Sequence, residues 1–392
     1  MKRKQFWNND TEALIAIMLV LVILGIINVF SSSFILSESD YDTPYFFLKR
    51  QVISLGIGLV AFLICFRIDY HKWRNWVPIV FILNFAALIL VLIIGNEVNG
   101  AKRWLSIGPL SMQPAEIAKL VSIMMMAASL AYRINKNKII SLMNLQLGLI
   151  VLMAGFTEAE PDLGTACNII GVPLIMMVVA GLERKHIVLL SAVACAVIAV
   201  LCYKQPYRLE RIKVTWDPWS YAQDAGYQTV QSLSAIGSGE FWGMGLGVGV
   251  SKYEYLPEAH TDFAFAIFCQ ENGFIGAFFV FMLFAALTIY AARVSQRAMD
   301  VYGKILALGI MTLIIGQAVA NLLMVSGTFP VVGVPLPFIS YGGTSLIINM
   351  AAMGILTNIG SRSDRERRKQ AEYEEVVEEV PAPTKKLHLV KK

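Results

Sequence analysis

Residues 13–30 read A-L-I-A-I-M-L-V-L-V-I-L-G-I-I-N-V-F, an almost unbroken apolar run without a charged side chain. Its length is close to the roughly 20 apolar residues that a helix needs to cross a bilayer. The run is too long for the core of a signal peptide, and no small-residue cleavage site follows it, so we expect a retained helix. Similar runs recur along the chain and predict an integral membrane protein that crosses the bilayer many times.

The composition of the 392 residues agrees with this prediction. Only 16% of them are charged, whereas a soluble protein averages about 25%, and the mean hydropathy is +0.61. The apolar segments are continuous, unlike the roughly 10-residue alternating segments of an outer-membrane barrel. A large loop, 204–262, separates the seventh apolar segment from the eighth. We predict an all-α polytopic fold with about ten transmembrane helices, at 12–30, 48–66, 77–95, 115–132, 139–157, 164–181, 187–203, 263–292, 304–323 and 345–359.

Basic residues orient these helices, because Lys and Arg accumulate in cytoplasmic loops. They cluster before the first helix and after the second, fourth, sixth and eighth. Both ends of the chain, 1–11 and 361–392, are therefore expected in the cytoplasm, and 12–360 forms the transmembrane domain. The charged tail predicts a flexible extension. Its basic run, Arg365–Lys369, suits an anionic lipid surface more simply than a specific docking partner. The loops expected on the outer face are 31–47, 96–114, 158–163, 204–262 and 324–344.

The cysteines and histidines carry no recognisable site. The five cysteines include no Cys-x-x-Cys pair, and the four histidines show no metal-ligand spacing. The cysteines therefore suit apolar filling better than a disulfide or a metal set. The net charge of +5 follows the loop asymmetry, so it gives no reason to expect nucleic acid as a partner.

The loop and helix start at 99–120 read N-G-A-K-R-W-L-S-I-G-P-L-S-M-Q-P-A-E-I-A-K-L. Lys102 and Arg103 beside Trp104 suit an anchor at the membrane interface. An arginine fork also suits the binding of phosphate. The sequence leaves these two interpretations equally open.

Charged residues also flank the next helix and the following outward turn. Glu116 and Lys119 fall three residues apart on the helix after the proline, where they can pair on one face. The turn E-A-E-P-D, 158–162, places three acids between two apolar segments. The simpler interpretation is a proline turn with solvated acids. The alternative is a divalent cation held by oxygens, with Glu160 and Asp162 as ligands.

The long loop 204–262 is amphipathic and rich in Trp and Tyr, which predicts that parts of it lie in the membrane interface. Its glycine-rich part, 237–249, lacks the Lys-Ser/Thr ending of a phosphate loop. We expect tight turns and close packing there. The loop ends in S-K-Y-E-Y-L-P-E-A-H-T-D, 251–262, directly before an apolar segment. Its last residue, Asp262, could cap the following helix or, half desolvated, serve as a general base with a raised pKa.

The stretch S-G-T-F-P-V-V-G-V-P-L-P-F-I-S-Y-G-G-T-S, 326–345, interrupts a hydrophobic run with prolines and glycines. Non-helical backbone at membrane depth is tolerated only where protein buries it or where it lines a wet cavity. We therefore expect a re-entrant or interfacial loop beside a cavity, with hydroxyl groups from Ser340, Tyr341 and Thr344.

Taken together, these stretches resemble the SEDS family of shape, elongation, division and sporulation proteins. The similarity covers about residues 10–360 in order. One departure is Q-E-N-G at 270–273, where the family more often has two adjacent acids. The last part of the long loop is more similar to the division and sporulation branch (FtsW and SpoVE) than to the elongation branch (RodA). The matching stretches are G-A-K-R-W (100–104), Q-P-A-E-I-A-K-L (113–120), E-P-D-L-G-T-A (160–166), G-Y-Q-T-V-Q-S-L-S-A-I-G-S-G (226–239), Y-L-P-E-A-H-T-D-F (255–263) and P-L-P-F-I-S-Y-G-G-T-S (335–345).

The resemblance implies a peptidoglycan glycosyltransferase that polymerises lipid II at the outer face of the bacterial cytoplasmic membrane, in septal wall synthesis. It also implies a class B penicillin-binding protein and other divisome or elongasome membrane proteins as partners. The family's essential acid corresponds to Asp262, which would deprotonate the acceptor hydroxyl while cations neutralise the pyrophosphate. The implied cofactor is none, or a divalent cation (Mg²⁺ or Mn²⁺). The residues expected to bind substrate are Lys49, Arg50, Lys102, Arg103, Trp104, Gln113, Glu116, Lys119, Tyr255, Glu258, His260, Ser340 and Tyr341.

Three other functions remain open at this stage. A polytopic bundle with broken helices and acids would also suit a lipid II flippase, although the reactive groups gather in the outward loops rather than near the midplane. A scaffold that only recruits division partners would leave the His-Thr-Asp sequence at 260–262 without a role. A RodA-like polymerase of the elongation branch is the third alternative.

Overall fold

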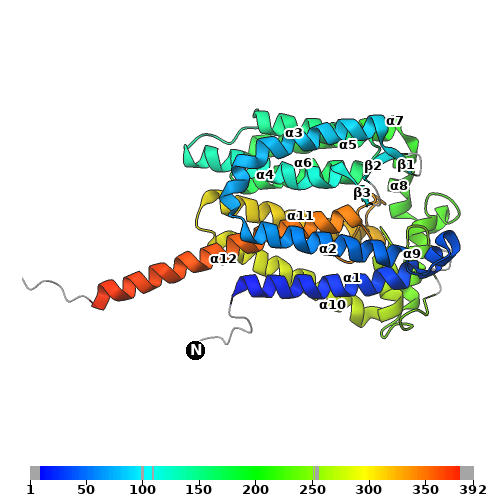
Figure 1. Cartoon of the computed structure of the whole chain (residues 1–392). Coiled ribbons are helices and arrows are strands. Elements are labelled where there is room, and N and C mark those ends of the chain that lie inside the picture. Colours follow the sequence, from blue (N-terminus) through cyan, green and yellow to red (C-terminus); the bar gives the residue numbers. More distant parts are fainter. Residues whose placement is uncertain (1–8, 99–100, 108–109, 250, 252–255, 380–392) are drawn as a thin grey trace, which may run out of the picture.

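The computed structural model describes residues 9–98, 101–107, 110–249, 251 and 256–379. Its long helices lie side by side in one bundle (Figure 1). Although residues 139–144 of the fifth predicted segment are not helical, each of the ten segments overlaps one helix. These are α1 (Asp10–Tyr41), α2 (Phe46–Arg67), α3 (Tyr70–Ile94), α4 (Pro114–Asn135), α5 (Leu145–Ala159), α6 (Leu163–Val179), α7 (Arg184–Lys204), α10 (Ala264–Arg297), α11 (Val301–Val325) and α12 (Gly343–Glu379).

The helical polytopic fold is confirmed, with ten as an approximate number of spans. Within the described residues, seven helices are long and apolar enough to cross a membrane, namely α1 to α4 and α10 to α12. Helices α5 and α6 are apolar but shorter, with 15 and 17 residues.

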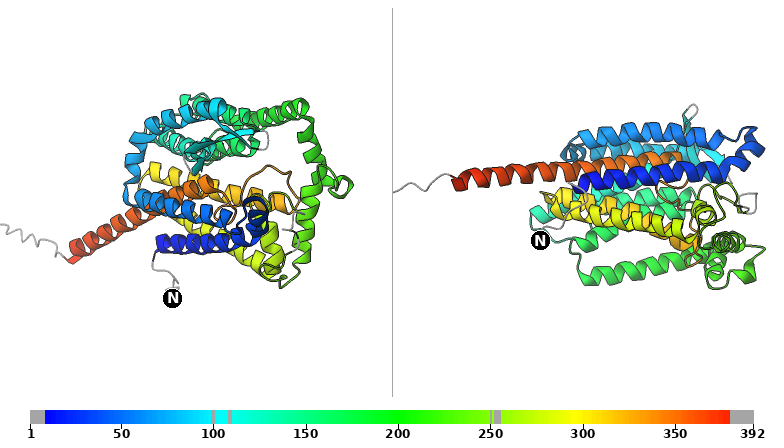
Figure 2. Two further views of the ribbon diagram at one scale, coloured as in Figure 1. Left: turned by 45° about the vertical axis from the view of Figure 1, so that its right-hand side comes forward. Right: turned by 90° about the horizontal axis from the view of Figure 1, so that it is seen from below.

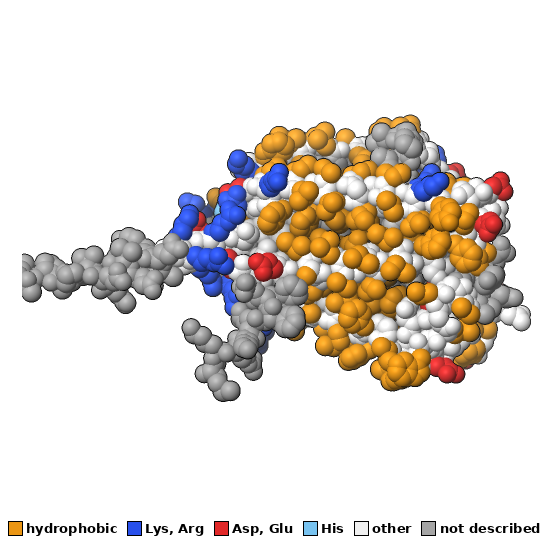
Figure 3. Space-filling model, turned by 60° about the horizontal axis from the view of Figure 1, so that its bottom comes forward, with side chains coloured by type: hydrophobic (Ala, Val, Ile, Leu, Met, Phe, Trp, Pro, Cys, Tyr) orange, Lys and Arg blue, Asp and Glu red, His pale blue; other side chains and the backbone are white. Residues whose placement is uncertain are grey.

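The two ends of the bundle differ in charge. The start of α1 and the extension of α12 lie at one end, which we call the tail end (Figure 1). The other end carries the short strands and α8, and we call it the site end. In Figure 3 a broad hydrophobic band separates the two, and most of the visible Lys and Arg side chains gather at the tail end. This is the asymmetry that the basic loops predict.

A small antiparallel sheet at the site end was not predicted. It consists of β1 (Asn96–Val98), β2 (Ala101–Ile107) and β3 (Leu110–Met112), in the order β1-β2-β3. The side chains of β2 alternate, since Ala101 and Leu105 are buried whereas Lys102 and Ser106 are exposed. That period of two was visible in the sequence. It was missed because only the hydropathy of the loop was considered.

The large loop is partly helical. It contains α8 (Pro206–Trp216), a 3-10 turn η1 (Trp219–Tyr221) and α9 (Tyr227–Ser238). Helix α8 crosses the site end of the bundle, as Figures 1 and 2 both show. Trp216, Trp219 and Trp242 are strongly exposed, as expected of aromatic side chains that lie in a membrane interface.

Helix α10 is broken at Gly273, where φ is 63°. The glycine-rich segment 240–245 fills the break. The amides of Met244 and Gly245 donate to the carbonyls of Gln270 and Glu271 at 3.0 Å each. In return the amides of Phe274 and Ile275 donate to the carbonyls of Glu240 and Phe241 at 2.9 and 3.3 Å. The predicted close packing of the glycine-rich segment is thereby confirmed.

The irregular segment between α11 and α12, residues 326–342, starts at the surface, where Phe329 is exposed, and enters the interior of the bundle at Val334. Val334, Leu336, Phe338 and Ile339 are almost fully buried. Two glycines admit its backbone, because a Cβ at Gly25 of α1 would overlap the carbonyl of Phe338 and one at Gly164 of α6 would overlap that of Val332. The prediction of non-helical backbone inside the protein is confirmed for residues 334–340, whereas a cavity beside it stays a prediction. We call the whole of 326–342 the buried segment.

The tail differs from its prediction in part. Helix α12 continues through Glu379 and projects from the bundle (Figures 1 and 2), so there is no break at residue 360. The physical reason is that residues 365–372 consist of Glu, Arg, Lys, Gln and Ala, which favour helix. An i,i+3 ion pair between Lys369 and Glu366, at 3.1 Å, adds to this preference. Residues 380–392 lie outside the described residues.

The break in α10 gives a test of this fold. At Gly273 the positive φ and the overlap of an added Cβ with the amide nitrogen of Gly243 both disfavour any side chain. We expect Gly273→Ala to lower the thermal unfolding midpoint of the detergent-solubilised protein by several degrees. Gly237→Ala in α9 is the matched control, because a Cβ there meets nothing within 4 Å. Equal midpoints for the two variants would contradict this role of Gly273.

Candidate active site at the site end of the bundle

Asp262 lies between the large loop and α10. The N-cap of α10 is Phe263, and no side chain forms a cap hydrogen bond there. Helix capping therefore does not explain Asp262, and that alternative is wrong. The backbone carbonyl of Asp262 accepts a hydrogen bond of 2.7 Å from the Asn321 amide of α11. Its carboxyl faces the buried segment, since a Cβ at Gly333 would lie 3.4 Å from Oδ2.

The carboxyl group of Asp262 has a raised pKa. Burial, with additional contributions from the carboxylates of Glu258 and Asp162, raises the pKa to about 7, whereas Arg103 and Arg211 oppose the shift. The residue as a whole remains partly exposed. A carboxyl with this pKa and some access can take up a proton at physiological pH.

Arg103 supplies the first cation of the site. It stands on β2, and its Nε donates to the carbonyl of Glu160 at 2.9 Å. A second guanidinium nitrogen donates to the carbonyl of Pro161. These bonds hold the guanidinium on the turn between α5 and α6. Of the two interpretations that the sequence left open for Arg103, this placement supports a role in the site, because an interfacial anchor would not require it.

Arg211 supplies the second cation, and sequence reasoning missed it. It projects from α8, and its Nη1 donates to the carbonyl of Val331 in the buried segment at 2.8 Å. The signal was present in R-L-E-R at 208–211, where two arginines fall three residues apart on an amphipathic helix. The prediction for that loop rested on its tryptophans and glycines and did not include these arginines.

Asn321 is a further residue that the sequence did not single out. It is fully buried in α11, and its Nδ2 donates to the carbonyls of both Asp262 and Val334, at 2.7 and 2.8 Å. One amide group thus fixes the start of α10 and the buried segment relative to each other. The available signal was an Asn one turn after Gln317 in a mainly apolar segment.

His260 and Tyr341 form an aromatic cluster beside Asp262. The ring centroids of Phe47 and His260 are 4.5 Å apart, and those of Phe47 and Tyr341 are 5.1 Å apart. The Tyr341 amide donates to the carbonyl of His260 at 2.9 Å. Burial lowers the pKa of His260, although Glu258 opposes the shift. A packed imidazole whose pKa is lowered suits a neighbour of the base better than the base itself.

Glu160 and Asp162 are the residues suggested for a divalent cation. Both are buried. Asp162 accepts from the amide of Thr165 at 3.0 Å and from Nε2 of Gln113 at 2.9 Å, so its oxygens are partly occupied. Neither carboxyl oxygen of Glu160 has a hydrogen-bond partner among the described residues. Burial raises the pKa of Glu160 to about 8, with a contribution from Asp162 and opposition from Arg103.

This pair fits a divalent cation poorly. In the described part of the chain, no group of three or more His, Cys, Asp and Glu side chains is placed to hold a metal. A guanidinium, that of Arg103, also lies on the same turn.

The remaining predicted residues lie around this centre or within the bundle. Glu116 and Lys119 form a buried ion pair at 2.7 Å inside α4, as predicted. Ser340 Oγ accepts from the amide of Leu336 at 3.0 Å and so stabilises the buried segment. Arg50 lies over the ring of Phe46 at 4.5 Å. Lys49, Arg50 and Lys102 are exposed, Trp104 is half-buried, and Tyr255 lies outside the described residues.

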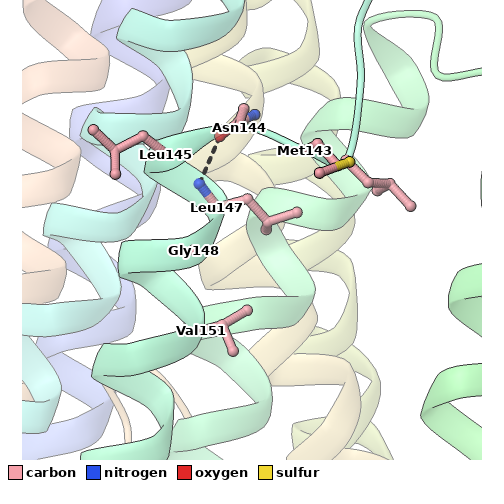
Figure 4. A pocket seen from close by; sticks show the side chains of 7 residues that line it. Met143, Asn144, Leu145, Leu147, Gly148 and Val151 are labelled. Atoms are coloured by element: carbon pink, nitrogen blue, oxygen red, sulfur yellow. Dashed lines mark hydrogen bonds between the residues drawn. The ribbon is translucent and has the colours of Figure 1, made fainter.

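A surface depression of about 520 Å³ lies far from this centre. Figure 4 shows Met143, Leu145, Leu147 and Val151 around it, with the Asn144 side chain accepting from the Leu147 amide at 2.6 Å. It is at the start of α5, and the 15 residues of that helix separate it from Glu160 by about 22 Å. Its lining is mainly apolar and without titratable groups, which makes it a poor candidate for catalysis.

The sequence matches a family described as cell cycle protein, which comprises FtsW, RodA and SpoVE, over residues 11–365. It is 37% identical over 356 residues to stage V sporulation protein E of Bacillus subtilis, covering 89% of this chain and 96% of that one. It is 38% identical over 364 residues to the probable peptidoglycan glycosyltransferase FtsW of Trichlorobacter lovleyi, covering 92% and 95%.

Solved structures share the fold. A chain of a peptidoglycan synthase complex, in which polymerization and crosslinking are coordinated, superposes with a TM-score of 0.72 at 26% identity, covering 89% of this chain and 97% of that one. The rod shape determining protein RodA of Thermus thermophilus superposes with a TM-score of 0.64 at 24% identity, covering 91% and 98%.

The raised pKa of Glu160 predicts a pH-dependent stability. Between its ordinary value of 4.5 and about 8, the folded protein holds a proton that the unfolded chain releases. The free energy of unfolding should therefore fall as the pH rises through this window. Glu160→Gln should melt like the wild type near pH 5 and at a higher temperature near pH 8.5. Glu97→Gln, at an exposed position of β1, is the control, and the same small difference at both pH values would contradict the assignment.

Proposed function

Because the chain belongs to the FtsW, RodA and SpoVE family of cell cycle proteins, we propose that it is a peptidoglycan glycosyltransferase with its active centre at Asp262. The observation that carries the site assignment is a carboxyl group whose pKa is raised to about 7 by burial and which feels the charge of two guanidinium groups held on backbone carbonyls. A base and a pair of cations are what glycosyl transfer from a lipid pyrophosphate requires.

In this mechanism the substrate is lipid II, a disaccharide-peptide on undecaprenyl pyrophosphate. The Asp262 carboxylate takes the proton from the acceptor 4-hydroxyl, and the oxygen attacks the anomeric carbon of the donor. The bond between that carbon and the pyrophosphate oxygen breaks, and the electron pair leaves with the pyrophosphate. Arg103 and Arg211 stabilise the negative charge that develops on the leaving group. No proton donor is required, because pyrophosphate is already a good leaving group.

The chain is a multi-pass membrane protein. We place the site end on the outer face of the cytoplasmic membrane and both termini in the cytoplasm, because the basic side chains gather at the tail end (Figure 3). We propose a role in septal wall synthesis, supported by the similarity to FtsW and SpoVE. A class B penicillin-binding protein is the proposed crosslinking partner, supported by the fold shared with a chain of a synthase complex. Other divisome or elongasome proteins are further proposed partners.

A divalent cation at Glu160 and Asp162 stays a proposal. If bound, Mg²⁺ or Mn²⁺ would neutralise the pyrophosphate. The two guanidinium groups supply positive charge in the described site, so no step above depends on a metal. The flippase alternative is less well supported, since Asp262, Arg103 and Arg211 all lie at one end of the bundle. Alternating access places its substrate site near the midplane.

The first test is Asp262→Asn. Asparagine has nearly the same shape but cannot accept the proton, and a general base contributes about 10²–10⁴-fold to a rate. We expect the purified variant to polymerise lipid II at least about 100-fold more slowly than the wild type. It should unfold at the same or a higher temperature, because burial already disfavours the charged form of Asp262.

Parallel measurements separate the alternatives. Glu97→Gln, at the exposed position on β1, should retain wild-type polymerisation. Lipid II transfer across liposomes is measured on the same preparations. Polymerisation by Asp262→Asn at the wild-type rate would overturn the role of Asp262. Transfer across liposomes by a wild-type protein that makes no polymer would favour the flippase.

The second test is the pH dependence of the initial rate. With the Asp262 pKa at about 7, the rate should rise about tenfold per pH unit below pH 7 and level off above it. Glu258→Gln removes a neighbouring negative charge and should move this limb to lower pH. Arg211→Gln removes a positive charge and should move it to higher pH. Limbs that stay in place, or move in the same direction, would show that another group controls the rate.

A further inference from the structure

A second cavity lies at the site end and has Arg211 in its lining. It has a volume of about 350 Å³ and is bounded by α8 and the start of α9. Small-molecule pockets begin at about 300 Å³, so this one has room for a single sugar ring rather than a large ligand. Its polar and aromatic lining consists of Tyr207, Glu210, Arg211, Asp224, Tyr227 and Gln228.

The wall formed by α8 is held in place before any ligand binds. The ring of Tyr207 lies 5.8 Å from Cζ of Arg208 and 5.6 Å from Cζ of Arg211. Arg208 is buried and pairs with Glu158 at 2.5 Å. Arg211 is fixed on the carbonyl of Val331 at 2.8 Å. Tyr207 thus keeps a fixed orientation while 46% of its surface remains exposed.

The opposite wall is equally ordered. The amides of Asp224 and Gly226 donate to the carbonyl of Tyr221 at 3.1 and 3.0 Å, and the Tyr227 amide donates to the carbonyl of Asp224 at 3.1 Å. Gly226 has to be a glycine, since a Cβ there would lie 2.7 Å from the carbonyl of Pro218. The side chains of Glu210 and Asp224 make no hydrogen bond to another described residue and are exposed toward solvent.

The charge and the hydrogen-bonding groups of the lining residues determine which part of the substrate fits this pocket. Two carboxylates against one guanidinium leave a net negative charge, which disfavours a pyrophosphate. Carboxylate and amide oxygens accept hydrogen bonds from hydroxyl groups, and the Gln228 amide can also donate one. Tyrosine rings combine apolar faces with a polar edge. Aromatic faces beside such acceptors suit a sugar, which is apolar on its ring faces and polar around its rim.

We propose that this pocket binds a sugar ring of the growing glycan strand and keeps the strand on the protein between successive couplings. The inference rests on the proposed polymerase function and adds a subsite to it. Arg211 links the two sites, because it lines the pocket and is bonded to Val331, two residues before the Gly333 that lies against Asp262. The pocket belongs to loop elements outside the membrane helices, where a strand that lengthens away from the bilayer would pass.

The test uses the full-length protein in nanodiscs and the double variant Glu210→Ala/Asp224→Ala. The matched control is Lys213→Ala, on an exposed position of α8 outside the pocket lining. Two quantities are measured. One is the affinity for a lipid-free, peptide-free glycan tetrasaccharide. The other is the length distribution of chains made from lipid II, together with the rate of the first coupling.

The double variant should bind the tetrasaccharide at least about tenfold more weakly and make chains at least about threefold shorter. Its first-coupling rate should stay within about twofold of the wild type, because Asp262, Arg103 and Arg211 are intact. Equal tetrasaccharide affinity or equal chain length for the variant and the control would overturn the subsite. An effect seen only with peptide-bearing strands would overturn the assignment of a sugar. Wild-type protein that makes no polymer but binds the tetrasaccharide through these acids would contradict the polymerase proposal and not the pocket.

Discussion

The site depends on one constraint: backbone that leaves the helical state inside the bundle must still have its polar groups satisfied. Asn321 meets part of this requirement for the buried segment, because its amide binds Val334 and the start of α10 together. Gly25 and Gly164 allow the segment to lie against two helices. With that segment in place, Gly333 lies at the Asp262 carboxyl and Val331 offers its carbonyl to Arg211.

Acidic and basic side chains of the site shift the pKa of Asp262 in opposite directions. Glu258 and Asp162 favour the protonated form of Asp262, whereas Arg103 and Arg211 favour the ionised form, and burial decides the balance in favour of a pKa of about 7. Each guanidinium is bound to backbone carbonyls rather than to a carboxylate. The cations therefore keep most of their charge available for an anionic ligand, as a preorganised site requires.

Much of the fold could be predicted from the sequence, because apolar runs of membrane length are long and strongly patterned. One helix overlaps each of the ten predicted segments, and the prolines and glycines of 326–345 indicated the non-helical segment correctly. The site was predicted only in part. Asp262, Arg103, Asp162 and Glu258 were named, and they do come together. Arg211 and Asn321 were missed because their roles come from contacts with carbonyls remote in sequence, which no local pattern records.

The exchange of hydrogen bonds at the break in α10 has a consequence for how the protein opens. Segment 240–245 and helix α10 share four backbone hydrogen bonds around Gly273. Neither can detach without leaving the other's amides and carbonyls unpaired, which costs several kcal/mol per group wherever water is excluded. The loop and the helix therefore form one cooperative unit. Their amide protons should exchange with solvent at a common rate, so a loop that looks peripheral in the chain order shares the kinetic protection of a membrane helix.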